Sequence, residues 1–168
     1  MADPMPRRPQ AMKATLSNDV FDDPNWIVER KLDGYRCLAF RDGGAVDLES
    51  RNFLSLNGRY PEVAEALEQD PCRHFVIDGE IVGLLHRRSS FEALQQRGHD
   101  PSVRVAYYVF DILWLDGEDL RDQPLRERKA ALRRRCASAA APCAGRRTAT
   151  PPKARRIWPT PVAAAGRA

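Results

Sequence analysis

The chain has 168 residues, of which 43% are hydrophobic and 30% are charged, and its formal net charge is +4. These proportions are ordinary for a globular domain, and they exclude collagen-like, coiled-coil and small disulfide-stabilised chains. No apolar run approaches the ~20 residues of a membrane helix, and the N-terminal residues lack the apolar stretch of a secretory signal, so we expect no membrane partner. The four cysteines are scattered without a CxxC pair, which argues against a zinc site or a disulfide framework and favours a reducing cytoplasm.

The hydrophobic pattern predicts strands mixed with short helices along residues 26–135. Alternating β-branched and aromatic residues indicate strands, whereas a proline or serine followed by apolar residues at helical spacing indicates helices. The predicted strands cover 26–32, 35–41, 45–50, 74–84 and 103–115, and the predicted helices begin at Pro61, Ser89 and Pro124. We expect the strand from His74 to be central, because it is apolar on both faces, and to be interrupted at Asp78-Gly79-Glu80. Hairpins mixed with short helices favour an α+β fold.

The charge divides the chain into parts. Residues 1–134 sum to −3, whereas residues 135–168 contain no acid, sum to +7 and consist mostly of Ala, Arg, Pro and Gly. Such a segment cannot bury enough apolar surface to offset its chain entropy. We therefore expect a flexible N-terminus over 1–12, a folded part over 13–134 and a disordered basic tail over 135–168. The tail is either a natural basic linker or a frameshift product of GC-rich codons, and the second interpretation is favoured.

The stretch from Glu29 to Arg36 is the motif that carries chemistry. It ends one predicted strand, turns at Asp33-Gly34 and begins another strand. A lysine at such a turn, here Lys31, can project into a cleft, where a nearby arginine and burial lower the pKa of its amine and make it a nucleophile suited to a phosphate. A plain hairpin with an exposed lysine is the alternative. Chance gives the pattern KxDGxR about 3 times in 1,000 chains of this composition, so the signal is specific.

The sequence ERKLDGYRC resembles the adenylation signature of ATP-dependent DNA ligases. Further blocks follow in the family's order, namely LESRNFLSLNGRYPEV, HFVIDGEIVGL, YYVFDILWLDGEDL and LRDQPLRERKAAL, and AMKATL resembles the family's first strand. The resemblance covers residues 11–132, and the stretch SSFEALQQR from Ser89 makes the chain most similar to the ligases of bacterial non-homologous end joining. It implies a two-layer antiparallel-sheet nucleotidyltransferase domain, ATP-grasp-like and here incomplete.

The resemblance also implies the roles of the reacting groups. Lys31 would attack the α-phosphate of ATP, release pyrophosphate and carry AMP as a phosphoramidate, while Asp33 would hold the turn. Glu80 would reach the ribose hydroxyl or a Mg²⁺ ion, which neutralises charge in phosphoryl transfer. AMP would then pass to the 5′-phosphate of nicked or broken double-stranded DNA, where the 3′-hydroxyl would displace it.

The remaining implied residues bind the nucleotide. Glu29 would accept a hydrogen bond from the adenine amino group and so give a preference for ATP, and Phe110 would stack on the adenine ring. Arg36 would contact the ribose or the DNA end, and Arg51 the ribose and phosphate side. Without the lysine block each has a plainer interpretation: Arg51 could pair with Glu49 or Asp47, and Phe110 could be a core residue.

Two blocks of the family are not found. No "EGhhhK" stretch supplies a second acid, and no "KxK" stretch supplies lysines for the α-phosphate. The resemblance stops near Leu132, where the composition changes, so we expect a truncated or frameshifted ligase with weak or no self-adenylation and no nick sealing.

Two other functions stay open. An RNA ligase or capping-type nucleotidyltransferase shares the KxDG lysine, and competition of ATP against GTP would separate these. A non-catalytic nucleotide- or DNA-binding fragment is the other alternative, with the +7 tail binding nucleic acid by counterion release. The leading interpretation is the ligase, working in DNA repair and recombination with end-joining repair proteins as possible partners, in the bacterial cytosol or nucleoid.

Overall fold

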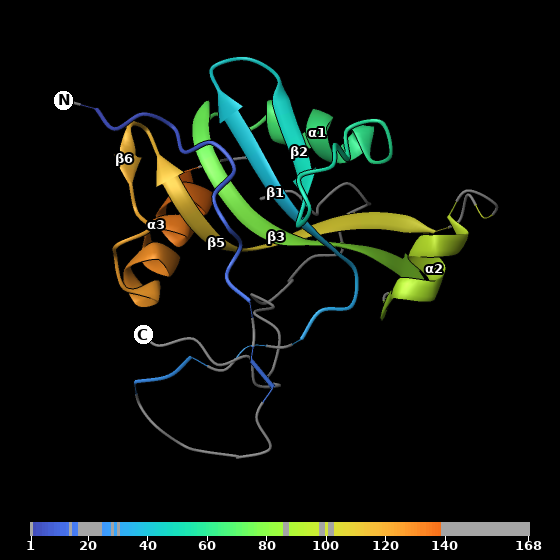
Figure 1. Ribbon diagram of the computed structural model, residues 1–168. Coiled ribbons are helices and arrows are strands. Elements are labelled where there is room, and N and C mark those ends of the chain that lie inside the picture. Colours follow the sequence, from blue (N-terminus) through green and yellow to red (C-terminus); the bar gives the residue numbers. More distant parts are fainter. Residues whose placement is uncertain are drawn as a thin grey trace.

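The computed structural model describes residues 2–13, 15–16, 25–27, 29, 31–85, 88–97, 100 and 103–138. Within them an antiparallel sheet carries helices on one face (Figure 1), which confirms the predicted α+β fold. The elements are β1 (Tyr35–Asp42), β2 (Val46–Ser50), α1 (Pro61–Glu68), β3 (His74–Leu85), β4 (Arg88–Ser90), α2 (Phe91–Gln96), β5 (Arg104–Leu115), β6 (Glu118–Asp119) and α3 (Leu125–Ser138). The strand order is β2-β1-β3-β5-β6, and β4 pairs with β3. None of the described helices is both long and apolar enough to cross a bilayer.

The centre of the sheet is β3, as its two apolar faces predicted. It pairs with β1 on one side and with β5 on the other. The expected interruption at Asp78-Gly79-Glu80 is wrong, because β3 runs through these residues as one twelve-residue strand. Gly79 does not form a turn but allows β3 to pack closely against β5. A Cβ at this position would lie 2.6 Å from the ring of Tyr107 and 2.5 Å from the carbonyl oxygen of Tyr108, both of which are too close. The pairing with β5 shifts register at this point.

Alternate residues of the strands point to opposite faces and build two cores. The larger core lies between the sheet and the helices and includes Phe75, Ile77, Tyr107 and Ile112. The smaller core lies on the opposite face and consists of Leu38, Phe40, Val76, Leu113 and Trp114. The helices begin where expected: Pro61 is at the first turn of α1, and the Ser90 hydroxyl caps α2 by accepting from the Ala93 N–H at 3.1 Å.

The N-terminal residues differ from the expected loose segment. Residues 2–12 run along the face of the sheet opposite to the helices (Figure 1). Asp3 donates its backbone N–H to the Gly117 carbonyl at 2.7 Å, and its own carbonyl accepts from Trp114 Nε1 at 3.1 Å. Met5 packs against the smaller core. We call residues 2–12 the N-terminal strap, because these contacts hold it on the sheet.

The strand expected over 26–32 is not formed by the residues described there. Trp26 makes one isolated bridge, and the ladder begins only at Tyr35, opposite Ile81. The described residues 27, 29 and 31–34 belong to no strand. The described residues of the AMKATL segment, 11–13 and 15–16, form no strand either.

Two arginines tie the helices to the rest of the fold. Arg41 is buried and donates to the carbonyl oxygens of Leu67 at 3.0 Å, Glu68 at 2.8 Å and Asp70 at 2.8 Å, which satisfies the end of α1. Arg135 of α3 lies 2.9 Å from Asp70, and both side chains are 2% exposed.

The packed part of the chain therefore continues beyond the expected boundary at residue 134. Helix α3 extends to Ser138 because Arg135 is held against Asp70 and over the ring of Phe75, 4.4 Å from its centroid. The rest of the predicted tail, residues 139–168, lies outside the described residues.

Candidate functional site

The candidate residues gather on the face of the sheet opposite to the helices, near the start of β1. Arg36 stands directly opposite Glu80 in the pairing of β1 with β3, and Asp78 lies two residues before Glu80. Since residues two apart on a strand share a face, these three charges lie side by side. The smaller core and the N-terminal strap occupy the other half of this face.

Arg36 and Asp78 form a two-pronged ion pair. Arg36 Nε lies 2.5 Å from Asp78 Oδ1, and Nη2 lies 2.6 Å from Oδ2. Burial raises the pKa of Asp78, while the bonded guanidinium acts in the opposite direction. The Arg36 guanidinium also lies 4.5 Å from the centroid of the Phe110 ring. Arg36 thus binds Asp78 through an ion pair and Phe110 through a cation–π contact, and it fixes the position of these two side chains relative to each other.

Glu80 is the half-buried acid of the group. Burial raises its pKa, and the charge of Arg36, a hydrogen bond from the Gly34 backbone and the charge of Lys31 oppose that rise. Lys31 therefore lies within electrostatic range of Glu80, at the turn that precedes β1. The Lys31 side chain is exposed among the described residues, which differs from the cleft burial expected of it.

Gly34 explains how this turn meets β3. A Cβ at Gly34 would lie 2.1 Å from the carbonyl oxygen of Ile81. Only glycine lets the backbone between Lys31 and β1 come this close to β3, where its N–H reaches the Glu80 carboxylate. The Asp-Gly pair of the motif is therefore needed to bring Lys31 and Glu80 together.

Glu29 reaches the same region through a partner that the sequence analysis missed. Glu29 Oε1 lies 2.5 Å from the amine of Lys129, and this amine also donates to the Phe110 carbonyl at 2.7 Å. Lys129 belongs to α3, one hundred residues away along the chain. The helical spacing could have predicted that Lys129 is buried, because it lies between Leu125 and Leu132 on the buried stripe of α3.

A second pair from α3 holds the next residue of β5. Arg128 Nε and Nη2 each lie 2.9 Å from one oxygen of Asp111, and both side chains are largely buried. Two neighbouring cations of one helix thus bind two neighbouring residues of β5, Asp111 and Phe110. These contacts of α3 hold the part of β5 that carries the Phe110 ring in place.

Arg51 is the candidate that the structure leaves apart. It follows the last residue of β2, its side chain is exposed, and among the described residues it forms no ion pair with Glu49 or Asp47. Ser50 stands opposite Cys37, next to Arg36, so Arg51 follows at the end of the sheet where the other candidates lie. Within the described part of the chain, no hydrogen bond or ion pair joins the Arg51 side chain to those of the other candidates.

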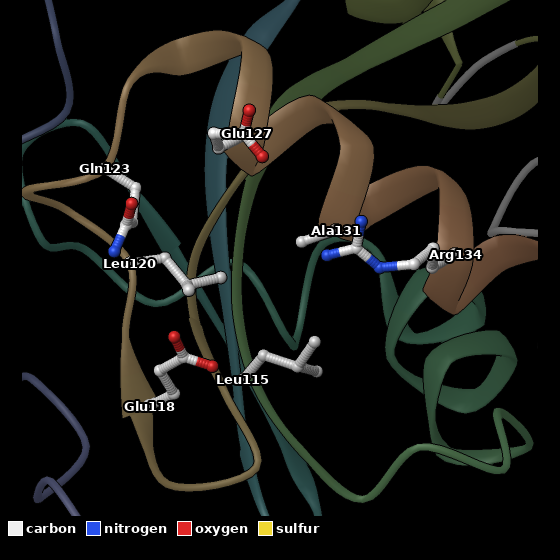
Figure 2. Close-up of a pocket in the computed structure, with 7 residues that line it drawn as sticks. All are labelled: Leu115, Glu118, Leu120, Gln123, Glu127, Ala131 and Arg134. Atoms are coloured by element: carbon white, nitrogen blue, oxygen red, sulfur yellow. The ribbon is translucent and has the colours of Figure 1, made fainter.

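A pocket of about 200 Å³ lies elsewhere, between the end of β5, β6 and α3 (Figure 2). Figure 2 shows an apolar floor of leucine and alanine with acidic and basic groups around it. Its lining residues are Leu115, Glu118, Leu120, Gln123, Glu127, Ala131 and Arg134. None of the candidate residues lines it, so this pocket is not part of the candidate site.

Comparison with known proteins connects this arrangement to one family. The family described as "ATP dependent DNA ligase domain" matches residues 8–148. DNA ligase C of Mycobacterium tuberculosis is 38% identical over 118 residues, which cover 65% of this chain and 33% of that protein. The multifunctional non-homologous end joining protein LigD of Mycobacterium bovis is 39% identical over 108 residues, which cover 64% of this chain and 14% of that protein.

Solved structures agree with the sequence relatives. The ligase domain of M. tuberculosis LigD matches with a TM-score of 0.62 and 34% identity, covering 70% of this chain and 39% of that one. A mycobacterial DNA ligase D complexed with ATP and MES matches with a TM-score of 0.61 and 34% identity, covering 70% and 38%. The chain spans about a third of the length of DNA ligase C and a smaller share of LigD.

Proposed function

The chain belongs to the family of ATP-dependent DNA ligase domains, and we propose that it carries the site of enzyme adenylation, with Lys31 as the nucleophile. The observation that carries the proposal is the convergence of separate segments. Lys31 lies within electrostatic range of Glu80, and Arg36, which stands opposite Glu80, lies over the Phe110 ring. Glu29 is joined to the Phe110 carbonyl through Lys129. The exposed Lys31 amine is accessible to a nucleotide from solution.

The reaction is a transfer of AMP to an amine. The unprotonated Nζ of Lys31 forms a bond to the α-phosphorus of ATP while the bond to the oxygen bridging the α- and β-phosphates breaks. Pyrophosphate takes that electron pair and leaves, the amine's proton passes to solvent, and AMP remains on Lys31 as a phosphoramidate. Arg51, exposed at the same end of the sheet, is proposed to meet the ribose and phosphates.

The base is proposed to lie against Phe110. An aromatic ring provides a stacking surface for adenine, and the carboxylate of Glu29 accepts a hydrogen bond from the 6-amino group. The Arg36 guanidinium lies over the Phe110 ring and binds Asp78, so Arg36 orients the platform in addition to any contact with the ribose or the DNA end.

Glu80 is the group suited to a Mg²⁺ ion. Magnesium binds one or two protein carboxylates together with substrate phosphates, and Asp78 is already committed to Arg36. When bound, Mg²⁺ would neutralise charge on the phosphates. The described residues hold no cluster of three or more metal-ligating side chains, so the proposed contact is one carboxylate plus the nucleotide.

The later steps and the partners follow from the relatives. We propose that AMP passes from Lys31 to the 5′-phosphate of nicked or broken double-stranded DNA, since the relatives are named DNA ligases. The match to a non-homologous end joining protein supports a role in DNA repair and recombination beside end-joining proteins. Bacterial relatives and a DNA substrate support a location in the bacterial cytosol or nucleoid.

Intact mass spectrometry tests the proposal. The purified chain is incubated with Mg²⁺ and ATP beside Lys31→Ala and, as a matched control, Lys13→Ala, which removes an exposed lysine of the N-terminal region. Because the stretch that supplies lysines for the α-phosphate is not found in this chain, we expect only weak adenylation: an acid-labile gain of one adenylyl group in a small fraction of the wild type and of Lys13→Ala, and none in Lys31→Ala. A chain that binds ATP without any gain would instead support the non-catalytic nucleotide-binding alternative.

A further inference from the structure

Lys129 is a buried lysine that the adenylation mechanism does not use. Only 4% of the residue is exposed, and it lies between Leu125 and Leu132 on the packed stripe of α3. Lysine is almost never this buried unless it is paired, because removing an ammonium group from water is costly. Its position therefore requires partners that compensate for the lost hydration.

Its amine has two described partners that belong to separate segments. Glu29 Oε1 lies at 2.5 Å and the Phe110 carbonyl oxygen at 2.7 Å. On its outer edge, β5 pairs only with β6, at Trp114 and Leu115, among the described residues. At this edge of β5 no described strand pairs with Phe110, and Lys129 instead donates a hydrogen bond to the Phe110 carbonyl. The same amine binds the Glu29 carboxylate.

The two partners of Lys129 belong to the residues proposed to bind the adenine base. Phe110 would stack on adenine and Glu29 would accept from its 6-amino group, so this step rests on the proposed function. The Glu29 side chain is only partly buried, at 27% exposure, and Glu29 itself belongs to no strand of the described structure. Lys129 is the group that ties it to β5, and the neighbouring Arg128–Asp111 pair keeps α3 in place beside it.

We propose that Lys129 is a positioning residue that fixes the Glu29 carboxylate beside Phe110 and thereby makes the site select a 6-amino purine over a 6-oxo purine. One oxygen of Glu29 is held by Lys129, which leaves the other to accept a hydrogen bond from the base. A 6-oxo group is itself a hydrogen-bond acceptor. It would lie against the Glu29 carboxylate, a second acceptor that Lys129 holds in place, and the two would repel each other. Discrimination of this kind is large when the buried acceptor cannot find another donor.

Binding of ATP and of inosine triphosphate tests the proposal, because these nucleotides differ only at the 6-position and its adjacent nitrogen. All proteins carry Lys31→Ala, so that binding stays reversible, and dissociation constants are measured by calorimetry with Mg²⁺. The full chain is compared with Lys129→Met, Lys129→Gln and Lys129→Arg. Arg134→Met is the matched control, since it removes an exposed cation from the same helix.

We expect the parent to bind ATP about 10- to 100-fold more tightly than inosine triphosphate. The ratio should fall to about 1 to 3 in Lys129→Met and Lys129→Gln, recover in part in Lys129→Arg, and stay unchanged in Arg134→Met. A general loss of structure would weaken the binding of ATP and of inosine triphosphate alike, and the ratio of their dissociation constants would not change. If Lys129→Met does not fold, Lys129→Gln carries the test, because it keeps a donor for the Phe110 carbonyl.

Three results would overturn the inference, and each has a different meaning. An unchanged ratio in both neutral variants would remove Lys129 from base selection while the nucleotide site stands. Binding of both nucleotides without preference in the parent would remove the role of Glu29 as well. No binding of either nucleotide by the parent would contradict the proposed function itself.

Discussion

The two faces of the sheet use the same strands for opposite purposes. On the face covered by the helices, Ile77 and Ile112 are fully buried, and the Tyr107 hydroxyl donates to the Cys37 carbonyl at 2.9 Å. On the other face, Arg36 and Glu80 are only partly buried. Alternate residues of one strand thus divide between packing and chemistry, and a shift of one residue in register would exchange them.

The ion pairs show the same contrast. Arg135 and Asp70, on the helix side, are both 2% exposed, and Arg135 Nη2 lies within ion-pair distance without a well-aligned hydrogen bond. On the other face, Arg36 remains 26% exposed while it binds Asp78. The first pair can only stabilise the fold, whereas the second has an open side toward which a ligand can approach.

The largest expected effect comes from the buried pair. Arg135→Ala leaves the Asp70 carboxylate buried with no cation at 2.9 Å, which should lower the free energy of unfolding by about 3–5 kcal/mol. Urea denaturation measures this, with exposed Arg134→Ala as the control. A loss below about 1 kcal/mol would mean that the two faces do not differ in how they use charge.

The next effect concerns the turn that carries Lys31. Gly34→Ala places a Cβ 2.1 Å from the Ile81 carbonyl oxygen, so we expect about 1–3 kcal/mol of destabilisation from overpacking, together with loss of the AMP adduct. Gly44→Ala is the matched control, because nothing lies within 4 Å of its Cβ. Equal stability of the two variants would show that the close approach at Gly34 is not required.

The N-terminal strap should contribute less. Met5→Ala removes a half-buried side chain from the smaller core and should cost about 1 kcal/mol. Exposed Arg7→Ala serves as the control, and thermal unfolding is the measurement. No difference between the two would mean that the strap lies on the sheet without stabilising it.

The smallest effect is a pH dependence at Glu80. Burial raises its pKa in the folded state above the ordinary 4.5, so its stabilising contribution is present below that value and is lost as the pH rises through the folded pKa. Glu80→Gln should therefore be more stable than the wild type at about pH 7, by about 1–2 °C in Tm, and equal to it at about pH 4. A difference that grows toward low pH would reverse the sign and contradict this account.

The sequence predicted the long elements of the fold well. Long runs of β-branched and aromatic residues indicated β3 and β5, and proline and serine at helix starts indicated α1 and α2, because these signals are local. Strands β4 and β6 were missed because they have three and two residues, too few to show a period. The N-terminal strap was missed because its Pro-rich sequence has no pattern of its own, and its partners Trp114 and Asp119 lie more than a hundred residues away along the chain.

The resemblance supplied the candidate residues one by one but not the contacts between them. The resemblance named Glu29 and Phe110, yet it could not name Lys129, because the contact joins residues one hundred positions apart. A charged residue on an otherwise apolar helical stripe was the available signal. For Arg36 the resemblance implied a binding role, and the structure adds its pairing with Asp78, which depends on the register of β1 against β3.

Arg41 has a consequence for the order in which the molecule opens. Its guanidinium closes the end of α1 by reaching three carbonyl groups from within β1, so the helix cannot fray at that end while the strand stays in place. Local opening of α1 and of the β1–β2 hairpin should then occur as one cooperative unit. Amide hydrogen exchange would record this as equal protection at the end of α1 and in β1, and a lysine at position 41, with a single amine, could not preserve it.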